Sequence, residues 1–348
     1  MSARLLAVVF LLLSTSSRIF AATTQSGLPL FRYGVYAVSN TCGAITFSAN
    51  QTDSFDSSQG TYAATKQNSG GNIGTNGNIT LNGQAVVNGT GSSPYTTTGS
   101  CTAQSITGLT SNGGATVSGG MVALTAPLAF ADPPVANPLP PTTNQSITGA
   151  CRGVAGCIAL DGSKNLALAP GPYGNLTITG NTTIHLRAGS YNINSIEIRG
   201  NSSLTIDSTP VLINVAGQGL GASDAAVDFT GDAVVNPAGV PSGFQIVYGG
   251  VAEIRVAGGA SSYGVVYAPK APVSMTGRSD WYGALIASTV SGNVSIHFDR
   301  ALLNLPLAIT ATPDHDPNGA GLEQHGCHGR FCLFRRSRDG VFLACVHN

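Results

Sequence analysis

The sequence predicts an all-β protein whose body is a right-handed parallel β-solenoid, preceded by a less regular β-rich N-terminal part. Three observations predict this fold: repeats at a pitch of 19–20 residues, glycine or asparagine corners between short alternating segments, and an unusual composition. Of the 348 residues, 45 are glycine and only 9% are charged. The glycine content disfavours long helices, and the narrow interior of a solenoid suits the small aromatic fraction of 7%.

The first repeat defines one coil of the predicted solenoid. Residues 175–186 (NLTITGNTTIHL) recur 20 positions later as residues 195–206 (SIEIRGNSSLTI). In both copies apolar and polar residues alternate on either side of a Gly-Asn corner, which is the period of a strand with one buried face. Stacked coils would lie ~4.8 Å apart, so equivalent apolar side chains would form columns in the interior.

The second repeat has a pitch of 19 residues and contains two strands in each copy. Val266 lies in the second copy and is expected to face the interior column. A sandwich of antiparallel hairpins is the alternative, but it would not produce a fixed pitch. The first strands are residues 244–248 (FQIVY), 263–267 (YGVVY) and 282–286 (YGALI), and the second strands are residues 254–258 (IRVAG), 273–277 (VSMTG) and, shifted by two positions, 294–296 (VSI).

An export signal is expected at residues 1–22. Arg4 supplies a positive charge, residues 5–13 are nine consecutive apolar residues, and Ala21 and Ala22 offer small residues for cleavage. A bilayer-spanning helix needs about 20 apolar residues. We therefore expect a mature chain with no transmembrane span that is exported, to be secreted, periplasmic or on the cell surface. An uncleaved anchor is the alternative.

The remaining chain divides by composition. Six prolines between residues 127 and 141 predict an extended connector, because proline cannot donate to a sheet ladder. It separates two domains or forms a long excursion from one solenoid. The segments are an irregular β-rich part (23–126), the connector (127–144), the solenoid domain (145–312) and an atypical tail (313–348) that is expected to be disordered.

Export makes the cysteines candidates for disulfides. Cys151 and Cys157 enclose a short loop, and Cys42 and Cys101 are the other pair within the body, although sequence does not fix connectivity. The other three, Cys327, Cys332 and Cys345, lie in the tail. None of the spacings is typical of a metal site, so we predict no metal and no cofactor.

Residues 263–269 (YGVVYAP), 282–284 (YGA) and 297–299 (HFD) resemble the C-terminal signature of a bacterial family. The family consists of exported β-solenoid domains of unknown function that are attached to pilus-assembly-type (minor-pilin-like) surface proteins. Residues 30–57 resemble the segment that follows the membrane helix in that family, so the likeness extends over residues 29–312. The resemblance implies an exported surface solenoid, and it supplies no catalytic residues.

Three aspartates are the candidates for catalysis. Parallel β-helices can cleave polysaccharides with carboxylates gathered on one face, and Asp224, Asp228 and Asp232 are spaced by four residues. On a strand this spacing would keep them on one face, where each would raise the pKa of the others. The flanking glycines favour a solvated loop instead.

Other polar residues are expected to be structural. His297 and Asp299 alternate with apolar neighbours, so with Arg300 they are expected to form a polar cap on the last coil. Thr177 and Thr179 resemble one rung of a threonine ladder that could bind ice, but Glu197 and Arg199 occupy the same positions one coil later. Charges at these positions would break a regular hydroxyl lattice.

The function that these observations predict is structural. The 16 basic and 16 acidic residues cancel, which argues against nucleic acid as a partner. We expect an exported, non-enzymatic surface or pilus-associated solenoid that makes adhesive or scaffolding contacts with a surface polymer, a polysaccharide, or pilus and surface proteins. The alternative is a polysaccharide lyase or hydrolase on a parallel β-helix.

Overall fold

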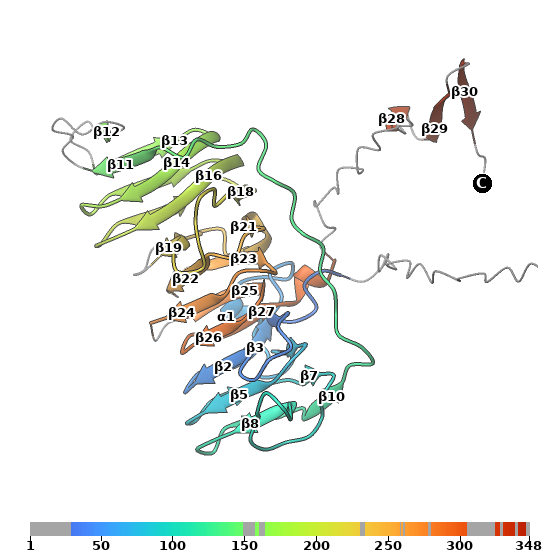
Figure 1. The fold of residues 1–348 in the computed structure, drawn as a ribbon. Coiled ribbons are helices and arrows are strands. Elements are labelled where there is room, and N and C mark those ends of the chain that lie inside the picture. Colours follow the sequence, from blue (N-terminus) through green and yellow to red (C-terminus); the bar gives the residue numbers. More distant parts are fainter. Residues whose placement is uncertain are drawn as a thin grey trace, which may run out of the picture.

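The computed structural model has the predicted all-β architecture, a parallel β-solenoid (Figure 1). One sheet of 23 strands, all paired in parallel, winds through the body, and a separate sheet of four strands completes one side. The described residues are 29–148, 157–159, 164–229, 234–257, 259, 262–277, 280–304, 324–327, 330–337 and 340–345.

The C-terminal unit (residues 144–304) forms the longer part of the solenoid. Its strands are short because glycine or asparagine corners interrupt them, and each stacks on the equivalent strand of the next coil. The elements are β11 (Asn144–Thr148), β12 (Cys157–Ala159), β13 (Asn165–Leu168), β14 (Gly171–Ile178), β15 (Thr183–Leu186), β16 (Gly189–Ile198), β17 (Ser203–Ile206), β18 (Val211–Val215), β19 (Ala225–Phe229), β20 (Val234–Val235), β21 (Phe244–Tyr248), β22 (Glu253–Ala257), β23 (Tyr263–Ala268), β24 (Val273–Thr276), β25 (Asp280–Ala287), β26 (Val290–Gly292), β27 (Ser295–Asp299) and the 3-10 helices η1 (Pro241–Gly243) and η2 (Arg300–Asn304).

The strand registers test the predicted repeats directly. Asn175 pairs with Ser195 and Tyr263 pairs with Tyr282, as the pitches of 20 and 19 residues predict. Two alignments were wrong. The strand at residues 244–248 lies one position out of the predicted register, because Gln245 pairs with Val265.

The second correction concerns the third copy of the second repeat. Val273 pairs with Val290 in β26, and not with residues 294–296. The corner before β26 is shorter than the equivalent corner one coil earlier, so the matching strand comes sooner. Residues 294–296 (VSI) belong instead to the next side of the coil, where Ile296 pairs with Trp281. Both segments carry a Val-Ser pair, and corner length decides between them.

The N-terminal unit (residues 30–123) also consists of coils. Strands β1, β4, β7 and β10 stack on one side, β2, β5 and β8 on the second, and β3, β6 and β9 on the third. Its elements are β1 (Val35–Ala37), β2 (Ile45–Ser48), β3 (Gln51–Phe55), α1 (Tyr62–Thr65), β4 (Ile73–Thr75), β5 (Ile79–Asn82), β6 (Val86–Val87), β7 (Gly91–Ser93), β8 (Leu109–Ser111), β9 (Thr116–Val117) and β10 (Met121–Ala123).

The two units meet at a seam where no covalent connection leads from one coil to the next. Strand β1 pairs with β25, β2 with β26 and β3 with β27, all in parallel. The first coil in the sequence therefore stacks on the last coil of the C-terminal unit. In space the solenoid runs from β11 to β27 and continues from β1 to β10 (Figure 1).

A strap (residues 124–143) joins the far ends of the two units. It contains the prolines of the predicted connector and runs along the body from β10 to β11 (Figure 1). Side chains of successive coils hold its backbone: Asn76 Nδ2 donates to the Leu128 carbonyl at 2.9 Å, and Tyr267 donates to Ala131 at 2.5 Å. Further along, Asn192 and Gln218 donate to the carbonyls of Pro138 and Pro140. The strap is thus fixed over most of its length.

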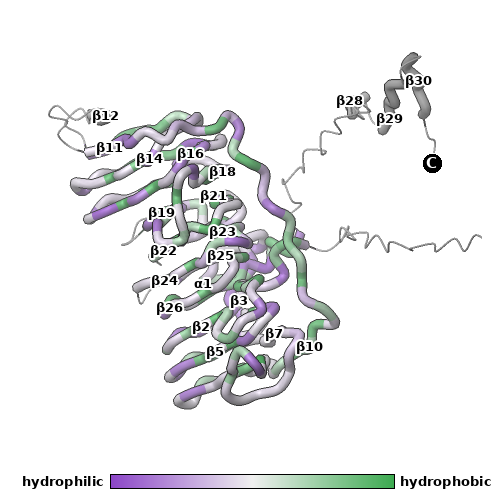
Figure 2. Tube along the Cα trace, in the orientation of Figure 1, coloured by the Kyte–Doolittle hydropathy of each residue, from purple (hydrophilic) through white to green (hydrophobic). Residues whose placement is uncertain are grey.

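The core has two parts. The interior column contains the inward Ile, Val and Leu side chains of both units, among them Val266, which is 1% exposed as predicted. A second cluster lies outside the sheet, where Tyr36 and Ile286 pack against Leu128 and Phe130 of the strap. Strands β1 and β25 are therefore buried on nearly all of both faces, whereas polar and apolar residues alternate in strands such as β14 and β22 (Figure 2).

One of the candidate disulfides is formed. Cys42 and Cys101 are bonded with their Cα atoms 5.6 Å apart, which ties the corner before β2 to the loop before β8. Cys151 lies outside the described residues, so its pairing with Cys157 stays a prediction. In the tail, which was expected to be disordered, β28 (Gln324–Cys327), β29 (Arg330–Ser337) and β30 (Gly340–Cys345) form an antiparallel sheet.

Candidate functional site: a polar ladder at the seam

The aspartates predicted as catalytic candidates serve different contacts. Asp224 is exposed in a turn and accepts the Gly221 N–H at 2.7 Å. Asp228 lies in β19 and pairs with Arg255 at 3.2 Å, and a shift of register between Ala225 and Val227 interrupts the strand alternation before it. Asp232 lies outside the described residues. Asp224 and Asp228 thus make separate contacts, and catalysis by the three aspartates stays a prediction.

Arg255 contacts two carboxylates, those of Asp228 and Glu253. Hydrogen bonds from its guanidinium to Glu253 and Asp228 raise the Arg255 pKa further, Glu253 contributing most. One coil further from the seam than Asp228, Glu197 pairs with Arg199 at 2.5 Å. These outward charges interrupt the hydroxyl positions after Thr177, as the sequence predicts. They neutralise one another on the surface.

Beyond these charges, a ladder of hydroxyl side chains begins that sequence analysis missed. Register pairs Ser274 with Ser291, Ser291 with Thr46, Thr46 with Thr80, and Thr80 with Thr110. All five residues are on the outward face of their strands, at least partly exposed, and none is charged. The ladder crosses the seam, so residues near position 46 follow residue 291 in space although they precede it in the chain.

A second outward column runs beside the ladder, two residues further along each strand. Ser48 pairs with Asn82, and Asn112 donates from Nδ2 to the Asn82 side-chain oxygen at 3.0 Å. On the other side of the seam, Thr276 and Asn293 are exposed at the ends of β24 and β26. This half of the side is consequently a broad, uncharged surface of hydrogen-bonding groups.

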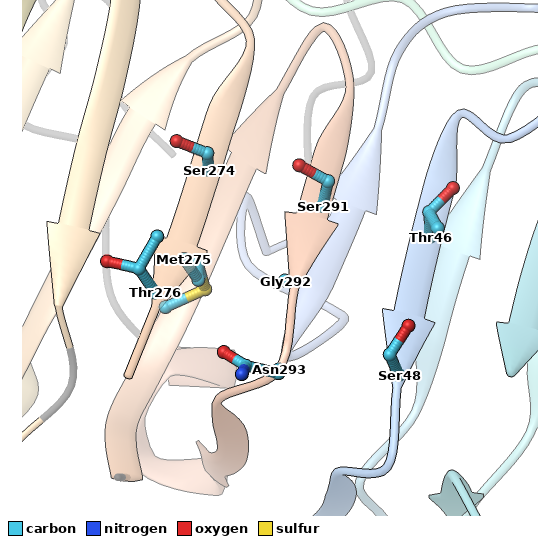
Figure 3. Close-up of a pocket in the computed structure, with 8 residues that line it drawn as sticks. All are labelled: Thr46, Ser48, Ser274, Met275, Thr276, Ser291, Gly292 and Asn293. Carbon is cyan, nitrogen blue, oxygen red and sulfur yellow. The ribbon is translucent and has the colours of Figure 1, made fainter. Parts of the chain in front are cut away.

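The surface is hollowed at the seam. An open hollow of about 360 Å³, here called the seam hollow, lies across β24, β26 and β2 (Figure 3). A side chain at Gly292 would place its Cβ 2.2 Å from the Met275 carbonyl oxygen, so only glycine fits at this point. The lining consists of Thr46, Ser48, Ser274, Met275, Thr276, Ser291, Gly292 and Asn293.

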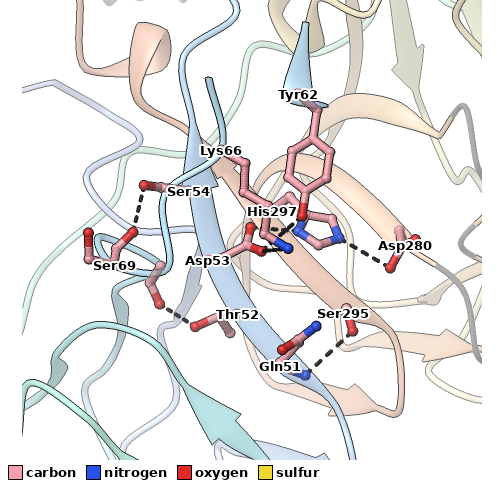
Figure 4. A network of polar contacts seen from close by, with 11 residues as sticks. Gln51, Thr52, Asp53, Ser54, Tyr62, Lys66, Ser69, Asp280, Ser295 and His297 are labelled. Carbon is pink, nitrogen blue, oxygen red and sulfur yellow. Dashed lines mark hydrogen bonds and ion pairs between the residues drawn. The ribbon is translucent and has the colours of Figure 1, made fainter. Parts of the chain in front are cut away.

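A buried polar network closes the seam on another side of the solenoid (Figure 4). His297 Nδ1 lies 2.6 Å from Oδ1 of Asp53, and both side chains are almost fully buried. The Tyr62 hydroxyl donates to the other Asp53 oxygen at 2.9 Å, and Lys66 Nζ lies 3.2 Å from it. His297 Nε2 lies 3.1 Å from Oδ1 of Asp280, without hydrogen-bond geometry.

Aromatic rings surround this network. Tyr263 stacks on Tyr282, and Tyr282 stacks on His297, with ring centroids 4.3 and 4.6 Å apart. Burial raises the pKa of Tyr62 and Tyr282 well above the ordinary value, and the hydrogen bond to Asp53 raises that of Tyr62 further. These hydroxyls stay protonated, and the network contributes to closure of the seam.

The expectation that His297, Asp299 and Arg300 cap the last coil was wrong. Strand β27 is followed in the sheet by β3, so it is not at an end of the solenoid. Asp299 accepts the Ser57 N–H at 2.9 Å and its hydroxyl at 2.5 Å, and Arg300 donates to the Phe55 carbonyl at 3.4 Å. The three residues fasten the N-terminal unit to the C-terminal unit.

Two further observations bear on the kind of site. Among the described residues, no three His, Cys, Asp or Glu side chains are grouped to hold a metal ion. Within the same residues, no helix has the length and apolar character that crossing a bilayer requires. Trp281 is fully buried in the interior core, so its ring serves packing.

The fold and the surface thus define a parallel β-solenoid with an uncharged hydrogen-bonding side. Residues 160–305 match the model of a family described as a domain of unknown function (DUF7305). The match begins near β13 and ends beside η2, so it lies within the C-terminal unit and stops at the seam. No curated protein and no solved structure matches the chain.

Proposed function

We propose that this chain is an exported, non-enzymatic β-solenoid of the cell surface or of a pilus, and that it makes adhesive or scaffolding contacts. The ladder from Ser274 to Thr110 carries the proposal, because it offers a continuous uncharged surface across five coils. Hydroxyl and amide groups hydrogen-bond without the cost of desolvating a charge. The rigid sheet holds them in fixed positions, which favours repeated weak contacts with an extended partner.

Export and surface location are supported by separate observations. The Cys42–Cys101 disulfide is typical of an oxidising compartment, and residues 1–22 have the charge, apolar run and small residues of a signal peptide. The association with pilus proteins rests on the resemblance of residues 263–269 and their neighbours. Mass spectrometry of the exported protein tests the signal, and protease treatment of intact cells tests surface exposure.

An adhesion assay tests the proposed contacts. Beads coated with the full chain are placed on cell surfaces and extracellular polymers, and retention under flow is measured. Thr80→Lys places a flexible charge in the ladder and is expected to reduce retention. Thr205→Lys, on an outward position of β17 in the four-stranded sheet, is the matched control. Equal retention of both variants and the unaltered chain would contradict a role for the ladder.

A polysaccharide lyase or hydrolase is the second candidate. Asp228 favours it, because this partly buried carboxylate lies beside Arg255 and its Oδ1 has no hydrogen-bond partner among the described residues. Turnover of acidic and neutral polysaccharides, compared between the unaltered chain and Asp224→Asn, Asp228→Asn and Asp232→Asn, separates the two functions. Turnover that is lost in these variants would establish the enzyme.

A further inference from the structure

We infer that the seam hollow binds a neutral polysaccharide, and that the site exists only while the N-terminal unit is docked on the C-terminal unit. This inference rests on the proposed adhesive function and names its ligand and its place. The lining comes from both units: Thr46 and Ser48 belong to β2, whereas Ser274 and Ser291 belong to β24 and β26 (Figure 3).

The lining has unused hydrogen-bonding capacity. Within the part of the chain that the structure describes, the side chains of Ser48, Ser274, Thr276, Ser291 and Asn293 have no hydrogen-bond partner. Thr46, which also lines the hollow, donates to the Gly43 carbonyl at 3.2 Å. The ladder hydroxyls further from the seam are engaged as well, since Thr80 donates to Asn78 and Thr110 to the Gly99 carbonyl. Five side chains that can both donate and accept therefore border one hollow, as a ligand bearing many hydroxyl groups requires.

The absence of charge in the lining selects the class of ligand. Among the residues that the structure describes, no acidic or basic side chain lines the hollow, so an anionic or cationic polymer would lose hydration with no opposite charge from these residues to replace it. An apolar ligand would leave the hydroxyl and amide groups unpaired, which costs free energy for each group. A neutral polymer with hydroxyl groups satisfies both conditions.

The shape of the surface favours a flexible chain over a crystalline lattice. The outward column beside the ladder mixes Thr276, Asn293 and Ser48, whose side chains differ in length, and Gly292 lowers the floor between them. A planar lattice needs groups at equal height. A polysaccharide chain can follow an uneven floor, and along the solenoid axis it would meet a new rung at every coil, ~4.8 Å apart.

Binding at a site divided between two units also couples the ligand to closure of the seam. The ligand binds only the docked arrangement, so mass action favours that arrangement: at a ligand concentration 100 times the Kd, opening of the seam falls about 100-fold. The coupling is reciprocal, so any change that opens the seam weakens binding by the same factor. Adhesion without the hollow would produce no such coupling.

A depletion assay with the full chain tests the site. Microcrystalline cellulose and insoluble β-1,3-glucan are the neutral probes, and alginate and chitosan gels are the charged ones. We expect retention on at least one neutral probe and on neither charged gel. Ser291→Glu should weaken binding at least about tenfold, since its charge would be desolvated against a neutral chain. Thr205→Glu, on an outward position of β17, should bind like the unaltered chain.

Three outcomes would overturn the inference: no retention on either neutral probe, equal retention on the charged gels, or equal effects of Ser291→Glu and Thr205→Glu. Circular dichroism and a melting curve establish that both variants fold. If neutral probes fail while the coated beads still adhere to cell surfaces, the polysaccharide site is refuted and the adhesive function stands. If the beads also fail to adhere, both are refuted.

Hydrogen exchange supplies a readout that adhesion alone would not change. The Leu285 N–H donates to the Gly34 carbonyl, and the Val290 N–H donates to the Ala44 carbonyl, so both amides report on opening of the seam. A soluble oligosaccharide of the retained glucan, at 100 times its Kd, should slow their exchange by up to about 100-fold. If a saturating concentration of the oligosaccharide does not slow hydrogen exchange at these two amides, the division of the site between the units is refuted.

Discussion

Replacement of Asp53 by alanine is expected to weaken the seam more than any other single change in the buried network. The Asp53 side chain is 1% exposed and lies 2.6 Å from His297 Nδ1. It also accepts the Tyr62 hydroxyl and faces Lys66. Without the carboxylate, the buried His297 imidazole and the partly buried Tyr62 phenol each lose the hydrogen-bond partner that they have among the described residues.

The expected cost follows from the burial of each partner. Removing Asp53 leaves the buried His297 Nδ1 without its hydrogen-bond partner, and an unsatisfied buried polar group costs about 1–3 kcal/mol. Lys66 adds little to this cost, because its side chain is 38% exposed and water can solvate it again. Since a domain of ordinary stability has about 5–15 kcal/mol in total, Asp53→Ala should remove a large part of the stability at the seam.

Cleavage of the strap makes the seam measurable. A protease site inserted after Val135, which is 77% exposed, allows the strap to be cut in the folded protein. We expect the two units of the unaltered protein to stay together on a sizing column after cleavage, and those of Asp53→Ala to separate. Lys66→Ala is the control and should change unfolding by no more than about 1 kcal/mol. The argument fails if Asp53→Ala and Lys66→Ala unfold at the same urea concentration.

Four further outcomes are expected. Val266→Asp would place an unpaired charge in the interior column, so urea denaturation should show several kcal/mol of lost stability or an unfolded chain; an unchanged curve would contradict its interior position. Cys101→Ser opens a loop with a sequence separation of 59 and should lower the free energy of unfolding by about 4 kcal/mol at most, compared with reduced unaltered protein as the control. Burial raises the pKa of Asp299 above 3.8, so the folded state binds its proton more tightly and stability falls as the pH rises from 3.8 through the raised pKa; Asp299→Asn should flatten this part of the stability curve. Burial, and then the charge of Asp280, raises the pKa of Tyr282 above 10.0, so stability should fall as the pH rises beyond 10.0, and Tyr282→Phe should reduce that slope in denaturation series.

The sequence predicts those parts of the fold in which pairing strands are near neighbours in the chain. The pairs Asn175–Ser195 and Tyr263–Tyr282 could be predicted because each coil repeats the alternation of the last. The lengths of the corners between strands were predicted less accurately than these strand pairs. Because the corner before Val290 is short, the partner of Val273 is Val290, and not the later Val-Ser segment at residues 294–296.

The seam and the surface that crosses it could not be predicted in this way. Thr46 and Ser291 face each other in register although 245 residues separate them in the chain, and no local pattern records such a pair. The contact between His297 and Asp53 is equally distant. Local patterns therefore place His297 at the end of the solenoid, and they show the hydroxyl column only at Thr177 and Glu197, where charges interrupt it.

The seam also determines the order in which this protein can fold. Val35 pairs with Leu285. The edge of β1 that faces the C-terminal unit therefore stays unpaired until β25, near the end of that unit, has formed. Contacts between residues so distant in sequence make folding slow, because the loop must close before the contact forms. During that time the strands near Val35 present an unpaired edge, which is the kind of surface that aggregates or requires a chaperone. The completed rod is rigid, but its assembly depends on a late encounter between the beginning and the end of its folded body.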